Sequence, residues 1–303
     1  MIGHWRSGTT LLHELMCLDD RFAFPSNFET FVPHHFLVSQ PIVMPLLKLL
    51  LPKKRPMDNM SVYPDSPQED EFALMVLGAA SQYRRMAFPH TKNEYYRYLD
   101  AENLAPEQLE FLKQQIKLFF KALTYKYGKR LILKSPPHTG RIRSLAQWFP
   151  GARFVHISRH PYEIVPSTMR LWKIVDGVHA YQKPRYTDEE LMDYICQCKD
   201  VMYAAYFRDQ SILDSKQIVE IRFDDLTSDP AGTIGRIYEQ LELGDCSQVT
   251  KSVKENFENR KGHRKNVYDV DDLVERIDSE WADYMQRFGY ENRVGDSQRT
   301  CAV

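Results

Sequence analysis

The feature that most constrains this chain is a glycine loop at its start, which runs directly into an amphipathic helix. Residues 3–10 read G-x-x-x-x-G-T-T, the outline of a phosphate-binding loop with Thr9 where lysine is usual. Glycines let the backbone curl so that successive N–H groups point at one anion, and the helix that follows adds the positive end of its dipole. The pattern predicts an anion site formed by Arg6, Ser7, Gly8, Thr9 and Thr10.

Short apolar and β-branched runs alternate with helical patterns along the rest of the chain. We expect strands at 130–133, 153–158 and 217–223. We expect helices at 9–18, 66–80, 106–127, 140–148, 161–172, 187–210, 230–243 and 271–288. Ser66 is the candidate N-cap of the second helix, with Pro67 at its first position. Long crossovers between strands predict an α/β fold, a three-layer α/β/α arrangement around a central, mainly parallel sheet.

The same pattern predicts how the chain is organised into domains and where its first strand lies. No stretch rich in Pro, Gly or Ser divides the chain, so residues 1–303 are expected to form one domain, with a largely helical insertion at about 30–125. The strand that carries a phosphate loop should precede Gly3, but only Met1 and Ile2 stand there. The first strand is therefore expected to be truncated, and we predict reduced stability and weak activity for this chain.

Composition excludes several classes of function. Lys plus Arg number 40 against 41 Asp plus Glu, so the net charge of -1 argues against nucleic-acid binding over a whole surface. The five cysteines are odd in number and irregularly spaced, which predicts free thiols in a reducing, cytoplasmic compartment. No metal-binding motif such as HExxH is present, and no signal peptide is visible.

The longest apolar run covers residues 36–52 and is interrupted by Pro41, Pro45 and Lys48. It is too short for a membrane span, so we expect a buried or surface-docking segment. Because residues 53–55 read KKR, weak contact with a membrane surface stays open.

The stretch R-S-G-T-T-L-L resembles the loop that holds the 5′-phosphosulfate in sulfotransferases using 3′-phosphoadenosine-5′-phosphosulfate (PAPS). It is most similar to the bacterial sulfotransferase family proteins and the tyrosylprotein sulfotransferases. The resemblance implies a P-loop-like fold, PAPS as co-substrate and no metal. It further implies sulfuryl transfer to a hydroxyl or amine on a carbohydrate, lipid or small molecule.

The resemblance also assigns a second anion site, for the 3′-phosphate. In this family an arginine at a strand end and a serine eight residues later bind that group, and here they are Arg159 and Ser167. Pro166 predicts a kink just before the serine. A late basic loop commonly closes over the phosphate, which implies Arg264 and Lys265.

The catalytic roles come from the resemblance as well. It implies Arg6 at the bridging oxygen, Lys134 on the sulfuryl group and Glu29 as the base for the acceptor. Other candidates for the base stay open: Glu69, Asp70, Glu71 and His4. Ser135 and His138 follow Lys134 closely enough to line the same rim. A structural role stays open for each: Lys134 could end a strand in solvent, and the acids at 69–71 could stabilise a helix dipole.

The sequence is also compatible with two other functions. One is a nucleotide-binding module that binds PAPS, or its desulfated product 3′-phosphoadenosine-5′-phosphate (PAP), without turnover. The other is a nucleotide kinase or NTPase, which the absence of the loop lysine disfavours.

Overall fold

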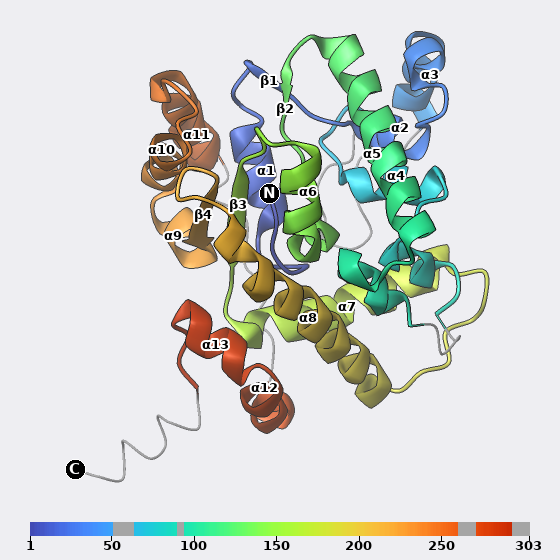
Figure 1. Cartoon of the computed structure of the whole chain (residues 1–303), viewed down its shortest axis with the longest axis vertical. Helices are drawn as coiled ribbons and strands as arrows, with labels where there is room; N and C mark the ends of the chain where they lie inside the picture. Colours follow the sequence, from blue (N-terminus) through green and yellow to red (C-terminus); the bar gives the residue numbers. More distant parts are fainter. Residues whose placement is uncertain (51–63, 90–93, 260–270, 293–303) are drawn as a thin grey trace.

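The computed structural model describes residues 1–50, 64–89, 94–259 and 271–292 (Figure 1). The strands are β1 (Phe22–Ala23), β2 (Arg130–Leu131), β3 (Phe154–Ser158) and β4 (Ile218–Arg222). The first α-helices are α1 (Thr9–Met16), α2 (Asn27–Phe31), α3 (Phe36–Leu50), α4 (Asp70–Val76), α5 (Pro106–Tyr127), α6 (Ile142–Trp148) and α7 (Pro161–His179). The later ones are α8 (Asp188–Asp209), α9 (Phe223–Ser228), α10 (Pro230–Gln240), α11 (Ser247–Asn259), α12 (Val274–Glu280) and α13 (Ala282–Phe288). The short 3₁₀ helices include η1 (Gln82–Met86), η4 (Pro136–Arg141) and η5 (Gln210–Ile212).

The sheet is parallel, and the first two residues of the chain lie in its middle. β1 pairs with β2, and β3 pairs with β4 from Phe154↔Ile218 to Ser158↔Arg222. Ile2 donates to Val155 O (2.9 Å) and accepts from Ile157 N (3.1 Å). On the other side, the Met1 nitrogen lies 2.7 Å from Leu133 O. Met1 and Ile2 therefore join the two strand pairs, and the predicted loss of stability stays a prediction.

Helices cover both faces of the sheet, as the sequence predicts. Val155 and Ile157 belong to a core cluster shared with α1, α10 and α11, whereas Phe154 belongs to a cluster with α5, α7 and α8. His156 lies on the latter face, where its ring stacks on Tyr206 and Phe288 at centroid distances of 4.6 and 4.9 Å. Successive strand residues point to opposite faces, so this alternation makes β3 the middle layer of an α/β/α arrangement (Figure 1).

Most predicted helices are present, but several bounds differ, and the single helix expected at 271–288 is divided into α12 and α13. α5 begins at Pro106 and ends at Gly128, whose left-handed conformation (φ +61°) terminates it. Thr187 and Glu190 form a capping box at the start of α8. The helix expected from residue 66 instead begins at Asp70, because Pro67 lies in an extended segment bridged to Ser26.

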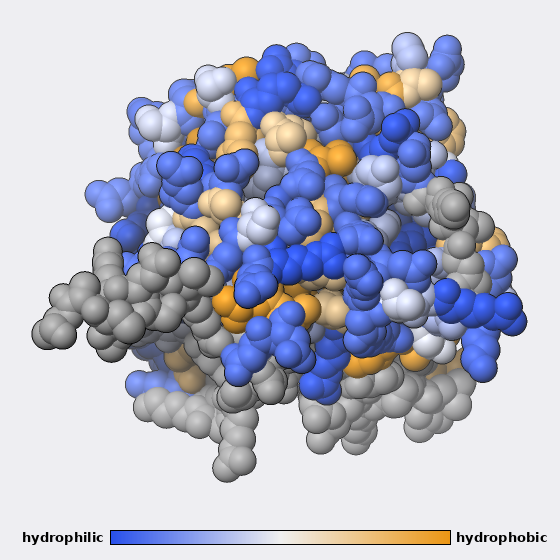
Figure 2. Space-filling model, turned by 90° about the horizontal axis from the view of Figure 1, so that it is seen from below, coloured by the Kyte–Doolittle hydropathy of each residue, from blue (hydrophilic) through white to orange (hydrophobic). Residues whose placement is uncertain are grey.

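Proline does not end the helices that contain it. α7 continues through Pro166 to His179, seven residues beyond the expected end, and α3 includes both Pro41 and Pro45. Each interior proline costs one backbone hydrogen bond, and α3 bears two such losses while it packs partly against the core. Among the described residues, no helix is long and apolar enough to cross a membrane. Figure 2 shows the lower end of the molecule as it is drawn in Figure 1; this surface is mainly hydrophilic, with an apolar band near its centre.

Candidate functional site

The loop before α1 has the backbone shape of an anion cradle. Gly3, Arg6 and Gly8 all have positive φ, at +139°, +66° and +105°. For Arg6 this is the left-handed region that a non-glycine residue seldom adopts, and such strain gathers at functional sites. Thr139 Oγ1 accepts a hydrogen bond from Gly3 N at 2.8 Å and so anchors the start of the loop.

Both loop glycines lie too close to their neighbours for any side chain. A Cβ on Gly3 would overlap the carbonyl oxygen of Ile157 in β3. A Cβ on Gly8 would come within 2.8 Å of Phe223 Cε2 and closer still to Cδ2. The two glycines therefore allow the loop to approach the ends of β3 and β4 directly.

The residues predicted for the two anion sites meet at the loop. Arg6 Nε donates to Ser167 Oγ on α7 at 2.9 Å. Arg159 Nη1 donates to the carbonyl oxygen of Arg6 at 3.1 Å, and its guanidinium lies 4.2 Å from the centroid of the Phe223 ring. Glu163, one turn into α7, holds the Arg159 guanidinium at 2.9 and 3.0 Å. Residues separated by more than 150 positions are thus brought into one cluster.

The hydroxyl-bearing residues of the loop lie at the start of α1. Thr9 is buried and Thr10 half-buried. The Ser7 hydroxyl oxygen is also buried, and it has no hydrogen-bond partner within the part of the chain that the structure describes. A buried polar atom without a partner carries a desolvation cost that an anionic ligand would relieve. Ser7 Oγ therefore fits a site that holds a phosphate or sulfate oxygen.

Lys134 lies just after the second strand segment and does not point into solvent. Its side chain is 4% exposed, and its Nζ lies 2.6 Å from Glu69 Oε1 at the start of α4. The other oxygen of Glu69 accepts from the Tyr83 hydroxyl. A buried charge is stable only when it is paired and hydrogen-bonded, and both conditions are met.

The three acids at the start of α4 each face a basic residue of the segment that follows β2. Glu69 pairs with Lys134, Asp70 with His138 (2.8 Å) and Glu71 with Arg141 (2.7 Å). Arg141 and Glu71 are fully buried, and Ser81 Oγ also donates to Glu71. The acids therefore anchor α4 against η4, in addition to any effect on the helix dipole. Ser135 is buried beside Lys134.

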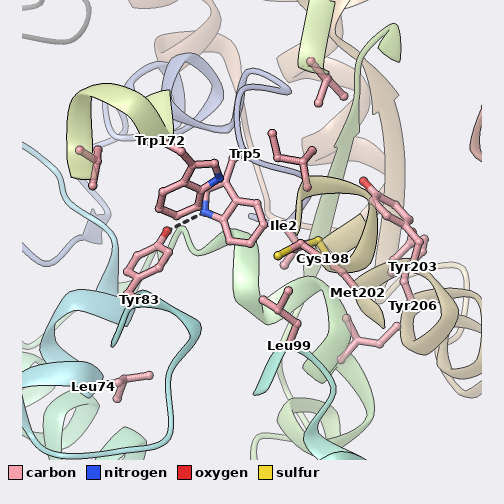
Figure 3. Packing of buried hydrophobic residues seen from close by; sticks show 14 of the residues in the cluster. Ile2, Trp5, Leu74, Tyr83, Leu99, Trp172, Cys198, Met202, Tyr203 and Tyr206 are labelled. Carbon is pink, nitrogen blue, oxygen red and sulfur yellow. Dashed lines mark hydrogen bonds between the residues drawn. The ribbon is translucent and has the colours of Figure 1, made fainter. Parts of the chain in front are cut away.

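A chain of hydrogen bonds links the loop to this ion pair. Trp5 Nε1 donates to Tyr83 Oη at 2.9 Å, and Tyr83 donates in turn to Glu69 (Figure 3). Burial, followed by the charge of Glu69, raises the pKa of Tyr83 well above its ordinary value, so the hydroxyl remains a donor. Trp5 and Tyr83 are not among the residues predicted from sequence, since an isolated aromatic gives no signal of its partner.

Glu29 is placed in a structural setting. It lies on α2, where Oε2 accepts from Ser26 N at 2.7 Å in a capping box. Its other oxygen binds the Lys126 ammonium and the Tyr127 hydroxyl, both on α5. The Glu29 side chain is fully buried. Its predicted role as the base therefore has no direct contact with Lys134 to support it.

The remaining sequence candidates divide between the interior and the undescribed residues. His4 is buried between Trp5 and Trp281, with centroid distances of 5.2 Å to each ring. Burial lowers the pKa of His4 to about 4, so its ring is neutral. Arg264 and Lys265 lie outside the described residues. Within those residues, no group of three or more His, Cys, Asp or Glu could hold a metal ion.

All parts of the cluster follow neighbouring strands. The loop follows Ile2, Lys134 follows the β2 segment, Arg159 follows β3 and Phe223 follows β4. The carboxyl ends of parallel strands lie at one edge of a sheet, which is where open α/β folds bind ligands. The two arginines predicted to bind anions and a buried lysine–carboxylate pair are thus collected at a single edge.

Known proteins resemble this chain along most of its length. A sequence model of the Sulfotransferase family matches residues 1–248. Omega-hydroxy-beta-dihydromenaquinone-9 sulfotransferase Stf3 of Mycobacterium bovis is 35% identical over 302 residues, covering 99% of this chain and 76% of that protein. The protein of the same name from Mycobacterium tuberculosis matches with the same identity and coverage.

Solved structures agree on the fold. Sulfotransferase STF9 from Mycobacterium avium superposes with a TM-score of 0.71 at 18% identity, over 96% of this chain and 76% of that one. Sulfotransferase STF1 from Mycobacterium tuberculosis superposes with a TM-score of 0.58 at 16% identity, over 93% of this chain and 75% of that one. The prediction of a P-loop-like α/β fold is confirmed.

Proposed function

The chain belongs to the sulfotransferase family and is an enzyme that transfers sulfur-containing groups, and we propose that its donor is PAPS and its acceptor a lipid hydroxyl. The observation that carries the proposal is the cluster of Arg6, Arg159 and Ser167 beside the Lys134–Glu69 pair, at one edge of the sheet. The acceptor class rests on the 35% identical relatives, whose name gives a hydroxylated dihydromenaquinone.

The donor is held by two groups of residues. The N–H groups and hydroxyls of residues 7–10 and the Arg6 guanidinium hold the 5′-phosphosulfate. Arg159 and Ser167 hold the 3′-phosphate, for which the planar fork of an arginine is well suited. The Ser7 hydroxyl, which has no hydrogen-bond partner among the described residues, supports this fit. Bound PAPS supplies an activated sulfuryl group with a stable phosphate leaving group.

The transfer itself falls to the lysine–carboxylate pair. Lys134 donates to the sulfuryl oxygens, and Arg6 neutralises the charge that collects on the leaving phosphate. Glu69 takes the proton of the acceptor hydroxyl as that oxygen bonds to sulfur. Tyr83 fixes the second oxygen of Glu69, which orients the carboxylate. Glu69 is our choice of base because it contacts Lys134, whereas Glu29 contacts Lys126 and Tyr127.

The donor site is tested by calorimetric titration with PAP, with AMP and ATP as controls. We expect micromolar PAP binding that AMP does not match and that Arg159→Ala abolishes. Tighter binding of ATP, with magnesium-dependent turnover, would support the kinase alternative instead. PAP binding without turnover of any hydroxylated isoprenoid or fatty alcohol would support the non-catalytic module.

The base is tested by two matched variants, Glu69→Gln and Glu29→Gln. We expect Glu69→Gln to bind PAP as the wild type does and to lose roughly 10²–10⁴-fold in kcat. Glu29→Gln leaves Lys126 without its buried partner, so we expect a loss of about 3 kcal/mol in unfolding free energy. The folded fraction of that variant should keep its kcat. The opposite pattern would assign the base to Glu29.

A further inference from the structure

We propose that the outer face of α3 and α5 docks on the surface of an anionic lipid bilayer, and that this face delivers the enzyme to its acceptor. The inference rests on the proposed lipid acceptor, but it concerns a surface that the catalytic cluster does not use.

α3 presents an apolar stripe to solvent. Val38, Ile42 and Leu46 are 74%, 76% and 57% exposed, and their spacing of four places them on one side of the helix. The opposite side is attached to the protein, since Phe36 is buried and meets Phe119 of α5 at 6.1 Å between ring centroids. Phe31, just before α3, is also half exposed. Aliphatic residues repeated on one solvent-facing side are typical of helices that lie in a membrane interface.

The neighbouring helix α5 adds a second apolar stripe. Phe111, Leu118 and Tyr125 are 41%, 57% and 82% exposed and recur every seven residues, so they share its outer side. Figure 1 shows α3 beside the end of α5, at the opposite end of the molecule from the hydrophilic face of Figure 2. The two helices are therefore neighbours near the end of α5, and each carries an exposed apolar stripe.

The charge of α5 argues for a bilayer as the occupant. Two lysines of α5 are already paired, Lys113 with Glu110 and Lys126 with Glu29. The charge offered to a partner therefore comes from Lys117 and Lys121, which have no carboxylate partner among the described residues. Lys117 and Lys121 border a shallow hollow of about 370 Å³ whose other lining residues are Phe120, Thr124 and Phe149. The two lysines suit the phosphate of an anionic lipid, and the two phenylalanines suit its acyl chain. A protein partner would need a complementary acidic surface, which nothing here specifies.

The test is sedimentation of the full chain with vesicles of phosphatidylcholine alone or with 30% phosphatidylglycerol. We expect binding to the anionic vesicles that weakens as salt is added. Ile42→Glu should weaken it at least tenfold, whereas Val178→Glu, at a 60% exposed position on α7, should not. Loss of binding in both variants, or in neither, would overturn the proposal.

Two matched double variants test how much the lysines contribute to vesicle binding. Lys117→Glu with Lys121→Glu should abolish the preference for anionic vesicles, and Lys251→Glu with Lys254→Glu on α11 should leave it intact. Equal binding to both vesicle compositions would refute the electrostatic part. Light scattering that shows a dimer broken by Ile42→Glu would refute a bilayer as the occupant.

Titration of each sample with PAP separates the two proposals. Normal PAP binding without vesicle binding overturns only the docking surface. Vesicle binding without PAP binding overturns only the assigned donor.

Discussion

Gly8 is the position where the fold of the loop and its function can be tested together. Replacement by alanine imposes a side chain at φ +105° and pushes a methyl group against the Phe223 ring. Gly128, the C-cap residue that follows α5, makes a matched control. Its φ of +61° is also left-handed, but a Cβ there would meet nothing within 4 Å.

The two substitutions differ in their steric cost. Left-handed backbone costs an alanine roughly 1–2 kcal/mol, partly offset by the lower entropy of the unfolded chain. Overpacking adds about 1–3 kcal/mol at Gly8 only. We therefore expect Gly8→Ala to lower the unfolding free energy by about 3 kcal/mol and Gly128→Ala by about 1 kcal/mol. At about 2.1 cal/mol/K per residue over 303 residues, these losses lower Tm by about 5 °C and 1.5 °C.

The assay is urea unfolding together with PAP titration. Gly8→Ala should weaken PAP binding because the loop moves away from Phe223, whereas Gly128→Ala should bind PAP normally. In a Phe223→Ala background the cost of Gly8→Ala should fall by about 1–2 kcal/mol, since the ring that it meets is gone. Equal losses for the two alanine variants, or no coupling to Phe223, would refute the steric reasoning.

Two further predictions concern buried groups on either side of the site. Burial lowers the pKa of His156 from 6.5 to about 3. Between pH 6.5 and pH 3 the unfolded chain therefore binds a proton at His156 that the folded chain does not bind. The free energy of unfolding falls as the pH drops below 6.5. His156→Phe should therefore remove about 2 kcal/mol of the loss in unfolding free energy between pH 7 and pH 5, and an unchanged pH dependence would contradict this. Arg141→Met leaves Glu71 charged and fully buried, so urea unfolding should show a loss of about 3–5 kcal/mol. Adding Glu71→Met should restore most of it, and a single-variant loss below about 1 kcal/mol would mean that the pair does not hold η4 to α4.

The parts of the site that could be predicted are those coded by local sequence. Gly3 and Gly8 indicate the loop in the sequence, because only residues without a Cβ fit at these two close approaches to β3 and Phe223. Arg159 and Ser167 were assigned through a family resemblance, and the structure brings both to the loop. The strand that carries Arg159 was visible as a short run of buried residues.

The parts that could not be predicted depend on contacts across the chain. Nothing near Glu69 in the sequence indicates that Lys134 would reach it from 65 positions away. Tyr83 joins Trp5 to Glu69 only because η1 folds back beside the loop. The start of α4 differs from the predicted start for the same reason, since pairing with Ser26 holds Pro67 in an extended segment despite a favourable local signal for a helix. Local propensity decides a boundary only where no such pairing competes.

The contacts of Arg159 have a consequence for selectivity. The Arg159 guanidinium is paired with Glu163, whose side chain is 34% exposed. If Arg159 binds the donor as proposed, an incoming anion must displace this carboxylate before it contacts the arginine. A small monoanion exchanges one partner for another and gains little, whereas a ligand with anionic groups at both sites recovers the cost through the second contact. In the proposed site, Glu163 would thus favour a ligand that carries two anionic groups over free phosphate or sulfate.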